Sequence, residues 1–86
     1  MYTASRNDAA LDQLTRLYGN FILDEQRRVA AGLETLFRRL EADPFAVGEA
    51  RGGPARIVFP DMLVVRFRVD PAARTVRLTG VRRFGP

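Results

Sequence analysis

The sequence predicts an α+β domain in which an antiparallel sheet packs on a helical hairpin, with elements in the order β-α-α-β-β-β. Two observations carry this prediction. In the first half, apolar residues recur at helical spacing, and in the second half they alternate with polar residues in short runs separated by turns. At 86 residues, the chain is expected to form one domain, residues 1–86, with a modest core.

The first two elements are expected to be an edge strand and a helix. Met1–Ser5 shows a faint alternation of apolar and polar residues, which suggests the strand. Ser5, with Asp8 three residues later, resembles a capping box that opens a helix near 7–18. The apolar residues at helical spacing in this region are Leu11, Leu14, Leu17, Tyr18 and Phe21.

A second helix is expected after a short connection. Gly19-Asn20 is a typical stop signal, and Asp24 offers a new N-cap. The helix should end before Asp43-Pro44, because proline disfavours helical backbone at the preceding residue. Its apolar stripe consists of Val29, Leu33, Leu36, Phe37 and Leu40. Two helices joined this closely form an antiparallel hairpin.

Three strands are expected after a loop over 43–54 that is rich in Gly and Pro. They span Ala55–Phe59, Met62–Val69 and Thr75–Val81. The connections between them, Pro60-Asp61 and residues 70–73, have the proline and aspartate that turns favour. We therefore expect these strands to form consecutive antiparallel pairs.

Alternation along the last two strands separates an apolar side from a basic side. The side expected under the helices holds Leu63, Val65, Phe67, Val69, Val76, Leu78 and Gly80. The opposite side holds Val64, Arg66, Arg68, Thr75, Arg77, Thr79 and Val81. Arg56 is expected beside these arginines from the neighbouring strand. Either Arg82 or Arg83 joins them, because consecutive strand residues point to opposite sides.

The basic charge is concentrated in the second half of the chain. All 14 basic residues are arginine. Residues 1–43 hold six Arg against seven Asp and Glu, a net charge of −1, whereas residues 44–86 hold eight against three, a net charge of +5. A basic sheet face of this kind suits a phosphate-rich polymer. It also suits a solvated face whose arginine stems cover apolar surface, and the pattern leaves both interpretations open.

Composition excludes several kinds of site. The sequence has no Cys and no His, so we expect no disulfide, no metal site and no cofactor. No apolar run approaches the ~20 residues that span a bilayer, and no secretory leader follows Met1. We therefore expect a cytoplasmic protein without membrane contact.

Several motifs along the chain carry a resemblance to a known family. They are Tyr2 followed by Ala10 and Leu14, the pattern L…DP…G at Leu40, Asp43-Pro44 and Gly48, VVRFRVD at Val64–Asp70, and VRLTGVRRF at Val76–Phe84. In this order they resemble the RelE/ParE superfamily of toxins from type II toxin–antitoxin systems. The resemblance covers nearly the whole chain. It implies the predicted fold and a bacterial toxin held inactive by a cognate antitoxin.

The resemblance implies one of two mechanisms of growth arrest. RelE-like members cleave messenger RNA in the ribosomal A site with basic residues, whereas ParE-like members poison DNA gyrase. Arg82 or Arg83 matches the terminal arginine of the cleaving members. A second arginine of those members would fall at Val64, and their late tyrosine or histidine is replaced by Phe84, so this set is incomplete.

General acid–base chemistry argues against a free-standing ribonuclease. RNA cleavage through the 2′-hydroxyl needs groups that accept and release protons, and arginine stays protonated. The remaining candidates are Glu49, Asp61, Asp70, Tyr2 and Tyr18. Arginines could still stabilise charge that develops on the phosphorus, so ribosome-assisted cleavage stays open.

The sequence therefore predicts a toxin whose basic face meets its target or its antitoxin. The residues expected there are Arg56, Arg66, Arg68 and Arg77 for binding, and Arg82 and Arg83 as candidates for a catalytic role. The antitoxin is expected to be acidic in its binding segment, and to lie across this face or along the helical hairpin. The alternative is a non-toxic module of the same fold that binds nucleic acid or protein.

Overall fold

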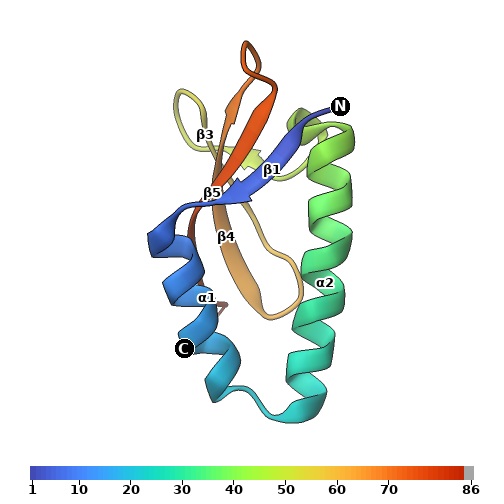
Figure 1. The fold of residues 1–86 in the computed structure, drawn as a ribbon, viewed down its shortest axis with the longest axis vertical. Coiled ribbons are helices and arrows are strands. Elements are labelled where there is room, and N and C mark those ends of the chain that lie inside the picture. The colour runs from blue at the N-terminus through green and yellow to red at the C-terminus, as the bar shows by residue number, and fades with distance from the viewer. Residues whose placement is uncertain (85–86) are drawn as a thin grey trace.

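The computed structural model describes residues 1–84, which form two helices and a five-stranded sheet (Figure 1). In chain order the elements are β1 (Thr3–Arg6), α1 (Asp8–Asn20), α2 (Leu23–Ala42), the short 3-10 helix η1 (Pro44–Ala46), β2 (Glu49–Ala50), β3 (Ala55–Val58), β4 (Leu63–Asp70) and β5 (Thr75–Arg83). The predicted α+β class is confirmed. The segment 43–54 was expected to be a loop, but it contains the short helix η1 and the strand β2.

The strands lie in the order β1-β5-β4-β3-β2. Strands β3 to β5 pair antiparallel, as predicted, because short turns connect them. β2, which was not predicted, also pairs antiparallel with β3. β1 instead pairs parallel with β5, so the sheet is mixed. A parallel pair needs a long connection, and here both helices and the other strands lie between the two partners in the chain.

Helix α1 begins after Asn7, whose side-chain Oδ1 accepts a hydrogen bond from the Ala10 N–H at 2.8 Å. The prediction of Ser5 as the cap is wrong, because Ser5 lies within β1. The helix also continues through Gly19 to Asn20, and the backbone becomes extended at Phe21. One glycine costs a helix only about 1 kcal/mol, which the buried face of α1 outweighs.

Helix α2 begins at Leu23, slightly earlier than predicted. The backbone N–H of Ile22 donates a hydrogen bond to Glu25 Oε1 at 3.0 Å and so satisfies the residue before the helix. Asp24 lies within the first turn instead of capping it. The predicted end before Asp43-Pro44 is confirmed. Neither helix of the described chain is long and apolar enough to cross a membrane.

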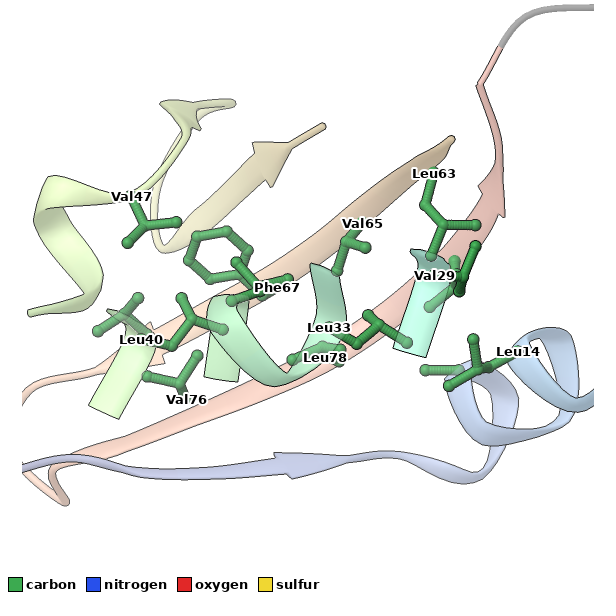
Figure 2. Packing of buried hydrophobic residues seen from close by; sticks show 14 of the residues in the cluster. Leu14, Val29, Leu33, Leu40, Val47, Leu63, Val65, Phe67, Val76 and Leu78 are labelled. Atoms are coloured by element: carbon green, nitrogen blue, oxygen red, sulfur yellow. The ribbon is translucent and has the colours of Figure 1, made fainter. Parts of the chain in front are cut away.

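Helix α2 covers one face of the sheet, and the core lies between them (Figure 2). α2 contributes Val29, Leu33, Leu36 and Leu40, and β4 and β5 contribute Leu63, Val65, Phe67, Val69, Val76, Leu78 and Val81. Each such side chain stabilises the fold by roughly 1.5–3 kcal/mol relative to exposure. This burial fixes which side of each strand faces the helices.

The pairing of β4 with β5 contains a β-bulge. Phe67 pairs with Leu78, but the preceding residue Arg66 pairs with Gly80, which leaves Thr79 as an extra residue. An inserted residue reverses the alternation of sides in the part of the strand that follows it. The two sides of β5 are therefore exchanged after Thr79.

The bulge corrects two predicted positions. Val81 pairs with Val65 and is buried in the core, although the alternation placed it on the basic side. Gly80 lies on the basic side, although it was predicted under the helices. A strict period of two cannot show an inserted residue, so the sequence pattern failed from Thr79 onward.

Candidate functional site

The sheet face turned away from α2, called the open face below, carries a row of arginines. Arg66 and Arg68 come from β4, and Arg77 and Arg82 come from β5. Because residues that pair across strands share a face, the β4–β5 ladder places all four on the same side. We call these four residues the arginine stripe. All of them are exposed.

The positive charges of the arginine stripe are not neutralised by carboxylates in the described part of the chain. Arg68 and Arg77 lie directly opposite each other, an arrangement of like charges that destabilises a sheet. Within residues 1–84, no member of the stripe forms an ion pair with a carboxylate. The positive charge is therefore available to an anion from outside the chain.

The sheet separates the two terminal candidates. Arg82 lies on the open face, whereas Arg83 pairs with Leu63 of the covered side. The Arg83 guanidinium carbon lies 5.2 Å from the centre of the Phe21 ring, and its Nη2 lies 3.8 Å from Glu25 Oε2. Arg83 thus ties the end of β5 to the connection between the helices, and only Arg82 joins the stripe.

By register Arg56 lies on the covered side of β3 and not, as predicted, on the open face, although it borders the hollow beside Arg66 and Arg68. It pairs with Phe67, whose side chain points into the core. Its guanidinium donates hydrogen bonds to the main-chain carbonyls of Val47 at 3.2 Å, Phe45 at 3.2 Å and Gly48 at 3.1 Å. These carbonyls lie in η1 and directly after it, and Arg56 supplies each with a donor.

Three hollows follow the arginine stripe along the open face. One of about 510 Å³ lies beside Arg68 and Arg77, a second of about 490 Å³ beside Arg66 and Arg68, and a third of about 350 Å³ beside Arg66 and Arg82. Neighbouring hollows share an arginine. An extended polyanion lying along the stripe would therefore meet a guanidinium group at each hollow.

Comparison of the whole chain with known proteins gives a likeness in structure. No family model and no curated protein matches the sequence. A chain of the chromosomal ParDE TA (toxin–antitoxin) system from P. aeruginosa superposes with a TM-score of 0.75 at 13% identity, covering 99% of this chain and 98% of that chain. The toxin–antitoxin complex RelBE2 from Mycobacterium tuberculosis gives 0.73 at 22% identity, with 95% and 90% covered. The chain has a RelE/ParE-like fold.

Two positions of this RelE/ParE-like fold bear on cleavage chemistry. Val64, where the resemblance implies an arginine in cleaving members, pairs with Arg82 and is only 1% exposed. Phe84, in place of a late tyrosine or histidine, packs edge-to-face on Phe59 with the ring centres 5.5 Å apart. Neither side chain adds a charge or a transferable proton beside Arg82.

Each candidate carboxylate of the RelE/ParE-like domain already has a partner within the chain. Asp61 accepts two hydrogen bonds from Arg28, each 3.1 Å long, and this contact raises the pKa of Arg28 above its ordinary value. Glu49 forms an ion pair of 3.0 Å with Arg51. Asp70 lies on the open face, where it lines the hollow beside Arg68 and Arg77, and it accepts a hydrogen bond from a backbone N–H in the turn that follows β4. None of the three is positioned as a free base beside Arg82.

The two candidate tyrosines are also apart from the arginine stripe. Tyr2 packs against the core, with its ring edge-on to Phe45 at 6.3 Å between centres. Tyr18 lies near the end of α1 and is partly exposed. The described residues therefore do not assemble an acid–base pair beside the arginine stripe.

Sequence reasoning missed one residue of the open face, Gln13. β1 ends at Arg6, so the β5 edge beyond it has no strand partner, and α1 runs alongside instead. There the Val81 N–H donates a hydrogen bond of 2.7 Å to Gln13 Oε1. No signal in the sequence marks this contact, because Gln13 is an ordinary polar residue on an exposed side of a helix.

Proposed function

We propose that this chain is the toxin of a toxin–antitoxin pair and that its open face meets the target. The arginine stripe carries the proposal, because it presents four exposed guanidinium groups without an ion-pair partner among residues 1–84. One carboxylate, Asp70, lines the hollow beside Arg68 and Arg77, but it forms no ion pair with either arginine. The opposed pair Arg68 and Arg77 therefore carries an electrostatic cost that an anionic partner would remove.

The fold supports the same proposal. The two similar structures are described as toxin–antitoxin assemblies, and the likeness extends over nearly the whole of each chain. An antitoxin for this chain would carry an acidic segment that neutralises the stripe and blocks the target. Such a partner explains how a surface of unpaired arginines is held inactive.

Binding, rather than hydrolysis, is the favoured mode of action. Poisoning of DNA gyrase, which the family resemblance implies for ParE-like members, needs a binding surface and no acid–base pair. Ribosome-dependent cleavage of messenger RNA is the second candidate. One observation favours it, because Arg82 lies on the open face without an ion-pair partner among residues 1–84 and could stabilise charge on a phosphorus.

Induced expression in bacteria tests the proposal. The chain should arrest growth when expressed alone, and co-expression of the product of the neighbouring gene should restore growth. Purified protein in a gyrase supercoiling assay, compared with ribosome profiling for A-site cuts, separates the two modes. Normal growth under induction would instead favour a non-toxic binding module of the same fold.

A further inference from the structure

The smallest of the three hollows lies over the β-bulge and differs from the other two in what surrounds it. Its lining includes a helix residue, Gln13, together with Arg66, Thr79, Gly80 and Arg82 from the two strands. No Asp or Glu lines it. The polar side-chain groups around it are two guanidinium groups, one amide and one hydroxyl, so hydrogen-bond donors predominate.

The Gln13 amide has a fixed direction. Its Oε1 accepts the hydrogen bond from the Val81 N–H, which requires an oxygen at that position because an amide NH₂ is only a donor. The Nε2 group must then point away from the strand edge. It makes no hydrogen bond to another residue in the described part of the chain, so both of its protons are available.

Gly80 leaves the floor of the hollow open. A methyl group at Gly80 would lie 3.6 Å from Gln13 Oε1 and 3.9 Å from the Arg66 side chain, which are ordinary contact distances. The backbone therefore tolerates alanine at this position, but the methyl group would occupy the space between the amide and Arg66. The hollow exists because the bulge brings a glycine to this side of β5.

We propose that this hollow binds one phosphate group of a nucleic-acid strand, with Gln13 Nε2 donating between Arg66 and Arg82. A phosphodiester offers unprotonated oxygens to several donors at once, which matches a site with two guanidinium groups and a neutral amide. The inference rests on the proposed function in assigning a ligand to the same open face. It adds α1 to that face and makes Gln13 a ligand-contacting residue.

Binding of a short, fluorescently labelled single-stranded RNA to the purified protein tests the proposal. In Gln13→Glu, the carboxylate still accepts from the Val81 N–H but replaces the donor by a negative charge, so affinity should fall about tenfold. In Gly80→Ala, the methyl group fills the hollow, and affinity should fall about threefold or more. NMR of the wild-type protein should show the Gln13 side-chain amide signals shifting when inorganic phosphate is added.

Thr15→Glu is the matched control. It adds the same charge to the same helix, two residues further on, where the side chain points to another side. Its affinity should stay within about twofold of the wild type, because salt screens a distant exposed charge. An equal loss in Thr15→Glu would overturn the proposal, since net charge alone would then explain the effect.

The outcome is independent of toxicity. Wild-type affinity in both Gln13→Glu and Gly80→Ala would overturn the phosphate site even if the chain arrests growth. RNA binding that depends on Gln13 would support the site even if expression of the chain leaves growth unaffected. In that case only the proposed toxin function would fail. If Gly80→Ala does not fold, the RNA affinity of Gln13→Glu and the Gln13 amide signals of the wild type still test the proposal.

Discussion

The Arg83 guanidinium lies over the Phe21 ring, 5.2 Å from its centre, whereas the preceding residue, Arg82, lies on the open face without an ion-pair partner in residues 1–84. Two adjacent arginines thus act differently. Arg83 holds β5 to the connection between the helices, and Arg82 points to the open face. The bulge at Thr79 decides this assignment, because uninterrupted alternation would exchange the two.

Replacing Arg83 should therefore affect stability. Arg83→Gln loses the contact with Phe21 and the ion pair with Glu25, two partly exposed interactions that together contribute about 1 kcal/mol. For a domain of this size, the melting temperature should fall by about 4–8 °C. Thermal unfolding followed by circular dichroism measures the change, with Arg82→Gln as the neighbouring control. Equal melting temperatures for the two variants would remove the structural role from Arg83.

Replacing one member of the opposed arginine pair should raise stability and weaken binding. Arg68→Gln removes the like-charge contact with Arg77 and should stabilise the fold by about 0.2–1 kcal/mol. The same change removes one phosphate contact, so the slope of log affinity for single-stranded RNA against log salt should become shallower by about 0.7. Arg27→Gln, on the exposed side of α2, should change neither quantity. If Arg68→Gln instead destabilises the fold, the like-charge contact between Arg68 and Arg77 does not carry the expected cost.

Arg56 should behave as a structural residue. Arg56→Met keeps much of the side-chain length but leaves three carbonyls of the 45–48 segment without their donor, so the free energy of unfolding should fall by about 2 kcal/mol. Arg56→Lys should recover part of this loss, because an ammonium group reaches fewer of the carbonyls. Urea denaturation measures both. Unchanged stability in Arg56→Met would mean that Arg56 is free for a ligand after all.

Gly48 should tolerate no side chain. Its φ is +70°, and a Cβ there would overlap the carbonyl oxygen of Ile57. Gly48→Ala should therefore cost about 3 kcal/mol or more in the free energy of unfolding. Gly52 has a similar φ of +81° but open space around it, so Gly52→Ala should cost only about 1–2 kcal/mol. Urea denaturation of the two variants separates the atomic overlap at Gly48 from the backbone strain that both positions share. Equal losses in the free energy of unfolding would rule out the overlap with Ile57.

Much of the fold was predictable because its signals are local. The stripe on α2 and the alternation from Leu63 to Leu78 need no knowledge of tertiary contacts, and both are confirmed. The cap of α1 was misplaced because Ser5 and Asn7 are both good caps, and only strand pairing of β1 decides between them. The parallel pairing of β1 likewise depends on packing that no short segment encodes.

The candidate site was less predictable for the same reason. Arg66, Arg68 and Arg77 precede the bulge, so the period of two placed them on the open face correctly. The position of Arg56 depends on the register of β3 and on carbonyls 8 to 11 residues earlier in the chain, which no periodic pattern marks, and its predicted side was wrong. Gln13 reaches β5 across 68 residues of chain, a separation at which a single sequence has no pattern to offer.

Growth arrest by variants of the open face tests the central claim most directly. The double variant Arg66→Gln and Arg82→Gln removes two charges from the arginine stripe, whereas Arg27→Gln and Arg38→Gln removes two exposed charges from α2. With matched expression in the absence of the antitoxin, the wild type and the α2 variant should arrest growth, and the open-face variant should allow it. Arrest by the open-face variant equal to that of the wild type would contradict the account.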